Sequence, residues 1–103
     1  MPNYLFVYHG GKKPETPGEV EQVITAWGAW FEDLGDAVVD GGNPVGASKT
    51  VTPKSVVDDG GSNPASGYSI ISAGSIDEAT AHAKGCPVLQ SGGNVEVAEI
   101  IVM

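Results

Sequence analysis

The 103-residue sequence predicts a single α+β domain, residues 1–103, in which two helices cover one face of an antiparallel sheet. Three observations carry this prediction: two helix starts with capping signatures, four short segments rich in β-branched and aromatic residues, and fifteen glycines that separate the segments. The chain is long enough for one hydrophobic core and leaves little room for two. The expected order is strand, helix, strand, an inserted hairpin, and then strand, helix, strand.

The first half of the chain contains the clearest strand and helix signals. Residues 3–9, NYLFVYH, predict a strand that ends at two consecutive glycines. Thr16 then predicts a helix N-cap, with Pro17 at the first helical position and Glu19 three residues after the cap. Apolar residues recur every three or four positions up to Gly35, which ends the helix. They predict one buried stripe: Val20, Val23, Ile24, Trp27, Trp30, Phe31 and Leu34.

The second half repeats this pattern after an inserted hairpin. A short strand within residues 36–42, DAVVDGG, precedes the segments SKTV and SVVD, which flank TPK and predict a small hairpin with a proline turn. Residues 67–73 predict the next strand, and a capped helix begins at Ser75 and ends at Gly85. The segment 94–103, NVEVAEIIVM, predicts the last strand.

This order of elements predicts a ferredoxin-like βαββαβ fold with the inserted hairpin, whose four main strands lie in the order 4-1-3-2. Both faces of the sheet are apolar, since Leu5 and Val7 alternate with Tyr4, Phe6 and Tyr8 on the first strand. Two helices can cover only one of these faces, and an open apolar face would be unusual on a monomer. We therefore expect a homodimer packed through the open sheet face as a dimeric α+β barrel.

The composition disfavours several classes of function. Thirteen acidic residues against five basic ones give a formal net charge of −8, which repels nucleic acids and anionic membrane surfaces. No segment approaches the roughly 20 apolar residues of a membrane span, and the first residues lack a signal-peptide pattern. The single cysteine, Cys86, has no intramolecular disulfide partner, so we expect a reduced, cytoplasmic protein. Two distant histidines and the absence of a phosphate-loop spacing lead us to expect no metal and no cofactor.

Candidate functional residues lie where the strand ends are expected to meet. His9 ends the first strand, and the predicted topology places Asp40, Tyr68 and Asn94 at the same end of the sheet. A histidine, a carboxylate and a phenol can support general acid–base catalysis or orient a polar ligand. The glycines after His9 would allow the backbone to approach that ligand closely. The alternative is that His9 is a hydrogen-bonded structural residue at a strand end.

Three further side chains have two interpretations each. Trp27 either packs in the core with Trp30 or lines a pocket between helix and sheet. His82 is predicted at the surface, near the C-terminal end of the second helix, where the helix dipole favours a cation. Cys86 is predicted as a small buried residue, because nothing nearby in the sequence would activate its thiol as a nucleophile.

Five segments, taken in order, resemble the YCII-related and DGPF group of small bacterial proteins. They are YLFVYHGG, AWGAWFEDLGDAVVDGGNP, DDGGSNPASGYSII, the helix after Ser75 that ends in KGCP, and GGNVEVAEI. The resemblance implies a ferredoxin-like subunit in a dimeric α+β barrel. The better-studied branch of this group resembles enzymes that pair a histidine in the first helix with an aspartate, and one relative acts as a dehydrochlorinase. Trp27 stands where that histidine would fall and DGGSNP replaces DGPF, so this mechanism does not transfer to the chain.

Two hypotheses for the function remain. The first is a small homodimeric protein that binds a small ligand or a partner without catalysis of its own. The second is a cofactor-free lyase or isomerase, similar to a dehydrochlorinase, that acts on a small molecule such as an aromatic compound. In this second hypothesis His9 is the general base, Asp40 orients it and Tyr68 positions the substrate. Trp27, Tyr68 and Asn94 are the ligand-binding candidates.

Overall fold

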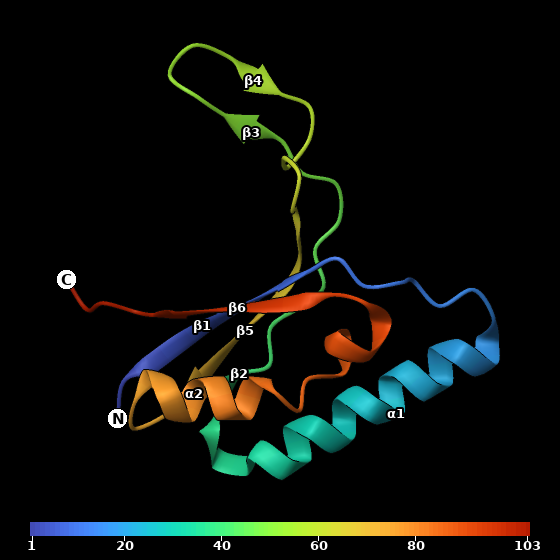
Figure 1. Ribbon diagram of the computed structural model, residues 1–103, viewed down its shortest axis with the longest axis vertical. Helices are drawn as coiled ribbons and strands as arrows, with labels where there is room; N and C mark the ends of the chain where they lie inside the picture. The colour runs from blue at the N-terminus through green and yellow to red at the C-terminus, as the bar shows by residue number, and fades with distance from the viewer.

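The computed structural model describes residues 1 to 103 and shows an α+β domain built on an open, four-stranded antiparallel sheet (Figure 1). The strands lie in the order β2-β5-β1-β6, and every neighbouring pair is antiparallel. This is the order predicted for the four main strands, and within one chain the sheet is not closed into a barrel. The bounds of these strands are β1 (Asn3–His9), β2 (Val38–Asp40), β5 (Ala65–Ser72) and β6 (Asn94–Glu99).

Both α-helices begin at the predicted caps. The hydroxyl of Thr16 accepts a hydrogen bond from the backbone N–H of Glu19, and the hydroxyl of Ser75 accepts one from Glu78, each at 3.1 Å. The sequence did not predict the two 3₁₀ helices, η1 and η2, which follow the α-helices. No helix combines the length and the apolarity needed to cross a membrane. The helices are α1 (Pro17–Leu34), η1 (Gly35–Ala37), α2 (Ile76–Ala83) and η2 (Pro87–Ser91).

The hydrophobic core lies between the sheet and the two α-helices, which cover the same face (Figure 1). Alternate residues of β1 and β5 point to this face and are buried, while the residues between them are partly exposed on the other face. The helices contribute a tryptophan from α1 and small alanines from α2. The buried core is Tyr4, Phe6, Tyr8, Trp30, Ile71, Ala73, Ala79, Ala83, Cys86 and Val88.

The first half of α1 is more exposed than its apolar stripe predicts. Trp30 is buried, and Trp27 and Phe31 pack at the margin of the core. Val20 and Ile24 are exposed, the latter at 67%, so the prediction of one continuous buried stripe is wrong for this half. Figure 1 gives the reason, since α1 runs past the edge of the sheet and its N-terminal half has no strand beneath it.

The last strand is shorter than predicted. β6 ends at Glu99, which pairs with Tyr4, the second residue of β1. One more backbone hydrogen bond runs from the N–H of Ile100 to the carbonyl of Asn3 at 2.9 Å, and Asn3 is the first residue of β1. The residues after Ile100 therefore have no strand to pair with, and they are exposed.

The inserted hairpin is present, and it stands away from the rest of the molecule. β3 (Thr50–Val51) and β4 (Val56–Val57) form a separate two-stranded sheet. In Figure 1 this sheet is the end of an arm that rises from the side of the main sheet opposite the helices. We call residues 45–62 the hairpin arm. All of them are exposed except Gly60, which is half-buried.

Candidate functional site

His9 lies at the end of β1 and both of its ring nitrogens are hydrogen-bonded. Nδ1 lies 2.8 Å from the backbone carbonyl oxygen of Asn63, and Nε2 lies 3.0 Å from Oε1 of Glu96. Both partners are acceptor oxygens, so the ring makes both bonds fully only when each nitrogen carries a proton. His9 as a whole is 8% exposed. Each ring nitrogen therefore faces a protein oxygen and not open space where a substrate could lie.

The carboxylate beside His9 belongs to Glu96, and the prediction that Asp40 would orient this histidine is wrong. Glu96 lies on β6, the strand that pairs directly with β1. Asp40 lies on β2, which β5 separates from β1, and its register places it opposite Ile70 in the middle of β5. The Asp40 carboxylate instead accepts a hydrogen bond from the N–H of Gly42 at 2.8 Å, as in an Asx turn.

Two other predicted residues do come close to His9 along the sheet. Asn94 is the ladder partner of His9 on β6. Tyr68 and Glu96 are the partners of Val7 on its two sides, so these three residues form a row on the open face, next to His9. This row places a phenol and a carboxylate on the surface that no helix covers.

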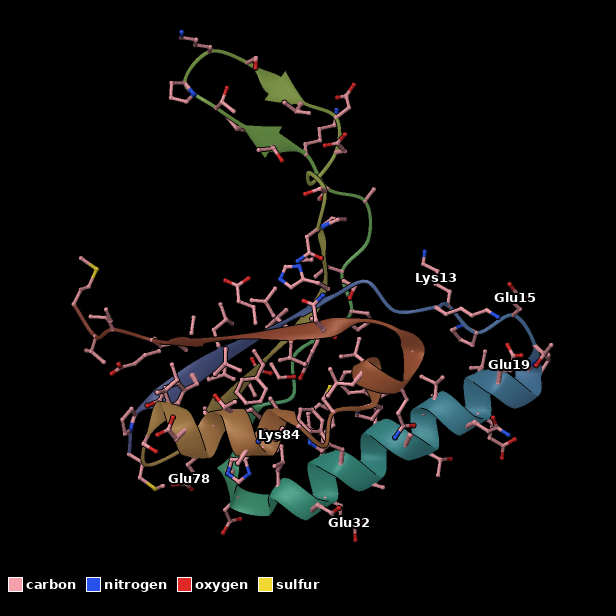
Figure 2. The ribbon with its side chains drawn as sticks, in the orientation of Figure 1. Lys13, Glu15, Glu19, Glu32, Glu78 and Lys84 are labelled. Carbon is pink, nitrogen blue, oxygen red and sulfur yellow. The ribbon has the colours of Figure 1, made fainter.

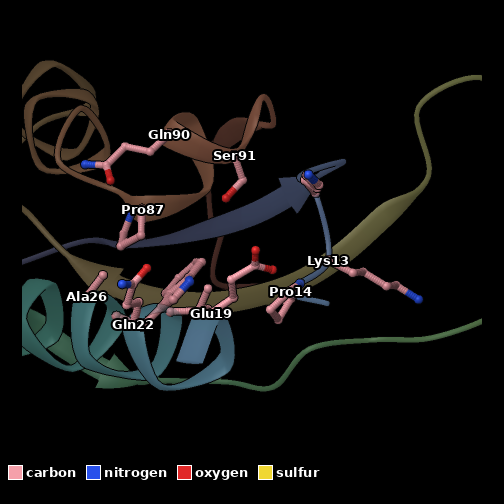
Figure 3. Close-up of a pocket in the computed structure, with 11 residues that line it drawn as sticks. Lys13, Pro14, Glu19, Gln22, Ala26, Pro87, Gln90 and Ser91 are labelled. Carbon is pink, nitrogen blue, oxygen red and sulfur yellow. The ribbon is translucent and has the colours of Figure 1, made fainter. Parts of the chain in front are cut away.

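A pocket of about 310 Å³ lies in the helix layer, between the first half of α1, the loop after β1, and η2 (Figure 3). This volume lies in the range of small-molecule sites in proteins. Trp27, Gln22 and Glu19 line it from α1, and Gln90 and Ser91 line it from η2. Of the candidate residues from the sequence, only Trp27 belongs to this pocket.

Trp27 joins the pocket to the core. Its ring meets that of Tyr8 edge-on, with 4.8 Å between the centroids, and that of Trp30 edge-on at 5.6 Å. These contacts hold the indole in place, while its partial exposure leaves apolar surface open to the pocket. One side of Trp27 therefore packs in the core, and the other lines a pocket that lies between α1 and η2 and not, as expected from the sequence, between helix and sheet.

The wall opposite α1 comes from η2, a segment to which the sequence assigned no role. The backbone N–H of Lys12 donates to the carbonyl of Ser91 at 2.9 Å and ties the loop after β1 to η2. Gly11 has a φ of +90°, and a Cβ there would lie 3.3 Å from a methyl group of Val88. The backbone at Gly11 therefore approaches η2 closely, whereas the sequence led us to expect a close approach to a ligand. Pro87, at the first position of η2, was the local signal for this element.

The pocket contains charged groups of both signs and neutral amides. Figure 3 shows Glu19 and Ser91 projecting toward the space between α1 and η2, whereas the long side chain of Lys13 points away from it. Oε2 of Glu19 accepts a hydrogen bond from the N–H of Glu15 at 2.7 Å, which fixes this carboxylate. The amides of Gln22 and Gln90 each offer donors and acceptors.

A chain of buried hydroxyl groups crosses the sheet beside the core. The hydroxyl of Tyr8 donates to Oγ of Ser69 at 2.7 Å, and Ser69 donates to the carbonyl oxygen of Gly41 at 2.7 Å. Burial raises the pKa of Tyr8 above its ordinary value, so the phenol stays protonated at neutral pH. These groups satisfy each other and serve the fold.

Cys86 is buried at the start of η2, and burial raises the pKa of its thiol to about 11, from an ordinary value of 9.0. The folded chain holds this proton more tightly than the unfolded chain. The resulting contribution to stability is complete below pH 9 and is lost as the pH rises through 11. We expect urea unfolding to show a steeper loss of stability from pH 9 to pH 11 in the wild type than in Cys86→Ala. Equal slopes would contradict this assignment.

His82 lies on α2 with its side chain 30% exposed, 3.7 Å from a carboxylate oxygen of Glu78 one turn earlier.

No known protein family, curated protein or solved structure matches this chain. The function is therefore inferred from the two arrangements described above, the His9 cluster and the pocket at Trp27.

Proposed function

We propose that this protein binds a small molecule in the pocket between α1 and η2 and has no catalytic activity of its own. The observation that carries the proposal is Trp27, whose indole is held by Tyr8 and Trp30 yet lines a pocket of about 310 Å³. The rest of the lining is mostly polar, so this indole offers a ligand an apolar surface among hydrogen-bonding groups.

The lining favours a small, planar and uncharged molecule with both donor and acceptor groups. The indole of Trp27 offers an apolar surface for stacking. Gln22 and Gln90 can each donate and accept, so a neutral amide in the ligand would complement both. Lys12 and Glu19 bring opposite charges to the rim, which gives no strong preference for an ion of either sign.

The alternative function, a cofactor-free lyase or isomerase with His9 as general base, has less support. A general base needs an unprotonated nitrogen within hydrogen-bond reach of the substrate. Both nitrogens of His9 already contact protein oxygens, and Asp40 does not orient the ring. His9 instead joins β1, β6 and the base of the hairpin arm.

The subunit is also proposed to be ferredoxin-like, to form a homodimer and to be related to the YCII-related group that its sequence resembles. The strand order β2-β5-β1-β6 and the placement of both α-helices on one face support the ferredoxin-like assignment. Leu5, Val7, Ile70 and Ala98 are partly exposed on the open face, and a second copy would bury them. The buried, unpaired thiol is compatible with a reducing, cytoplasmic location.

The indole N–H signals of the two tryptophans in an NMR titration test the ligand site directly. Benzamide, benzoate and benzylamine share a ring size and differ in charge. We expect benzamide to shift the Trp27 signal with a dissociation constant on the order of 1 mM, the range for so small a molecule, and the two ions to bind more weakly.

Trp30 is the control within the same molecule. Its indole nitrogen donates to the backbone carbonyl of His82 at 3.1 Å and its side chain is buried, so its signal is expected to move little. Trp27→Phe assigns the two signals. Equal shifts of both signals, or none at concentrations well above 1 mM, would count against a ligand site at Trp27.

A further inference from the structure

The hairpin arm makes almost no contact with the rest of the chain beyond its base. The molecule measures 43 × 43 × 18 Å and has a radius of gyration of 14.7 Å, whereas a compact domain of this length has about 13 Å. Figure 2 shows the side chains of the arm surrounded by open space on both sides. The hydrophobic core therefore holds the body of the molecule but not this segment.

An isolated two-stranded hairpin is only marginally stable in water, so a surface that covers it would stabilise it. Val51 and Val56 are ladder partners and lie on the same face of the hairpin. They are 77% and 58% exposed. This valine pair is the apolar surface that the arm offers to a neighbour.

The base of the arm is fixed to the sheet, which sets its direction. The N–H of Val45 donates to the carbonyl of Ser66 at 3.0 Å, and the N–H of Tyr68 donates to that of Asn43 at 3.2 Å. On the return leg, His9 holds the carbonyl of Asn63 at 2.8 Å. These bonds anchor both legs at the end of the sheet where β1 finishes.

The arm rises from the open side of the sheet, where a second copy would lie (Figure 1). Packed sheets lie about 10 Å apart, and strand residues advance by about 3.3 Å each. The eight residues from Val45 to Thr52 therefore span roughly 26 Å when extended. This length takes the tip of the arm past the sheet of a second copy and alongside its helix layer.

The charge of the arm also favours a second copy of this chain as its binding partner. The arm contains two lysines and two aspartates, so the entire net charge of −8 belongs to the rest of the chain. Lys49 pairs with Asp58 within the arm at 3.1 Å. Lys54, in the turn at the tip, has no ion-pair partner in its own chain and would meet the acidic body of a second copy.

We propose that the hairpin arm of each protomer clasps the second copy of this chain, with Val51 and Val56 packed on the partner and Lys54 near its acidic surface. The inference rests on the open-face dimer proposed above, and it adds a second, reciprocal contact to that dimer. It also gives His9 a role, because His9 anchors the arm that reaches across.

Sedimentation equilibrium of the full-length chain tests both contacts. The wild type is expected at twice the protomer mass of 10.5 kDa. Val51→Glu/Val56→Glu is expected to weaken the dimer at least about tenfold, because it places charges in an apolar contact. The matched control, Thr50→Glu/Val57→Glu, adds the same charges to the other ladder pair of the hairpin, which lies on the face opposite Val51 and Val56, and a smaller effect on the dimer is expected.

A spin label on the arm gives the direct measurement. Cys86 is buried, so Lys54→Cys can be labelled selectively at the tip and mixed with a ¹⁵N-labelled chain that carries no spin label. Broadening of amide signals in the ¹⁵N-labelled chain supports the clasp. If the wild type is a dimer but shows no such broadening and is not weakened by the valine variant, the clasp alone is wrong. If the wild type is a monomer, both the clasp and the dimer are wrong. Ligand binding at Trp27 is measured separately and stands in either case.

Discussion

Gly42→Ala is expected to destabilise the protein by more than about 3 kcal/mol, because the native backbone at this position excludes a side chain. Gly42 follows β2 at the start of the segment that leads to the hairpin arm, and its φ is +70°. A Cβ at this position would overlap the carbonyl oxygen of Tyr68 on β5. Since that oxygen belongs to the backbone of the neighbouring strand, it cannot move without breaking the pairing of the sheet.

Gly41→Ala is the matched control in the adjacent position. A Cβ on Gly41 would meet no atom within 4 Å and its φ is not positive, so a change within about 1 kcal/mol is expected. Urea unfolding at one protein concentration compares the two variants, since dimerisation would shift the apparent stability. Similar stabilities for both variants would show that Gly42, in the segment after β2, does not lie against Tyr68 as described.

His9→Ala is expected to lower the free energy of unfolding by about 2 kcal/mol or more, since it removes a buried, doubly hydrogen-bonded ring. Most of the loss is assigned to the bond with the carbonyl of Asn63, because the Glu96 side chain is 64% exposed and its bond is weakened by solvent. The same change should loosen the base of the hairpin arm, which faster hydrogen exchange in that segment would report.

The second histidine provides the control for this measurement. The side chain of His82 is 30% exposed and lies 3.7 Å from Glu78, so His82→Ala is expected to cost less than about 1 kcal/mol. If His9→Ala cost no more than His82→Ala, the fold would not need the imidazole. His9 would then return as a candidate general base, and the lyase hypothesis would regain support.

The elements that the sequence predicted well are those with local causes. Thr16 and Ser75 each start a helix by accepting a hydrogen bond from a residue three positions later, which is visible in the sequence itself. The alternation of β1 and the glycines around the hairpin are equally local signals. The strand order then followed from the order of elements and the rules that govern their connections.

The errors all concern which segments meet in space. The apolar repeat of α1 is continuous, but the helix is longer than the sheet beneath it, so Ile24 is exposed. The last strand stops at Glu99 because β1 offers no further partner, although the sequence stays apolar. Asp40 was expected beside His9, yet the short β2 pairs with the middle of β5. Local patterns contain no information on these lengths and registers.

The candidate site was predicted only in part for the same reason. Trp27 was recognised as a residue that could line a pocket, because an indole on a helix stripe fits either role. Gln90 and Ser91 were missed because η2 is a single short 3₁₀ helix, and neither residue type is distinctive outside its context. The pocket exists because Lys12 and Ser91 bring two distant loops together.

The most direct test of the central claim is to locate bound benzamide by intermolecular NOEs in solution. If the pocket between α1 and η2 is the ligand site, the ring protons of benzamide should show NOEs to the indole of Trp27 and none to Tyr68. NOEs to Tyr68 and His9 would contradict the claim, since they would place the ligand on the open face of the sheet.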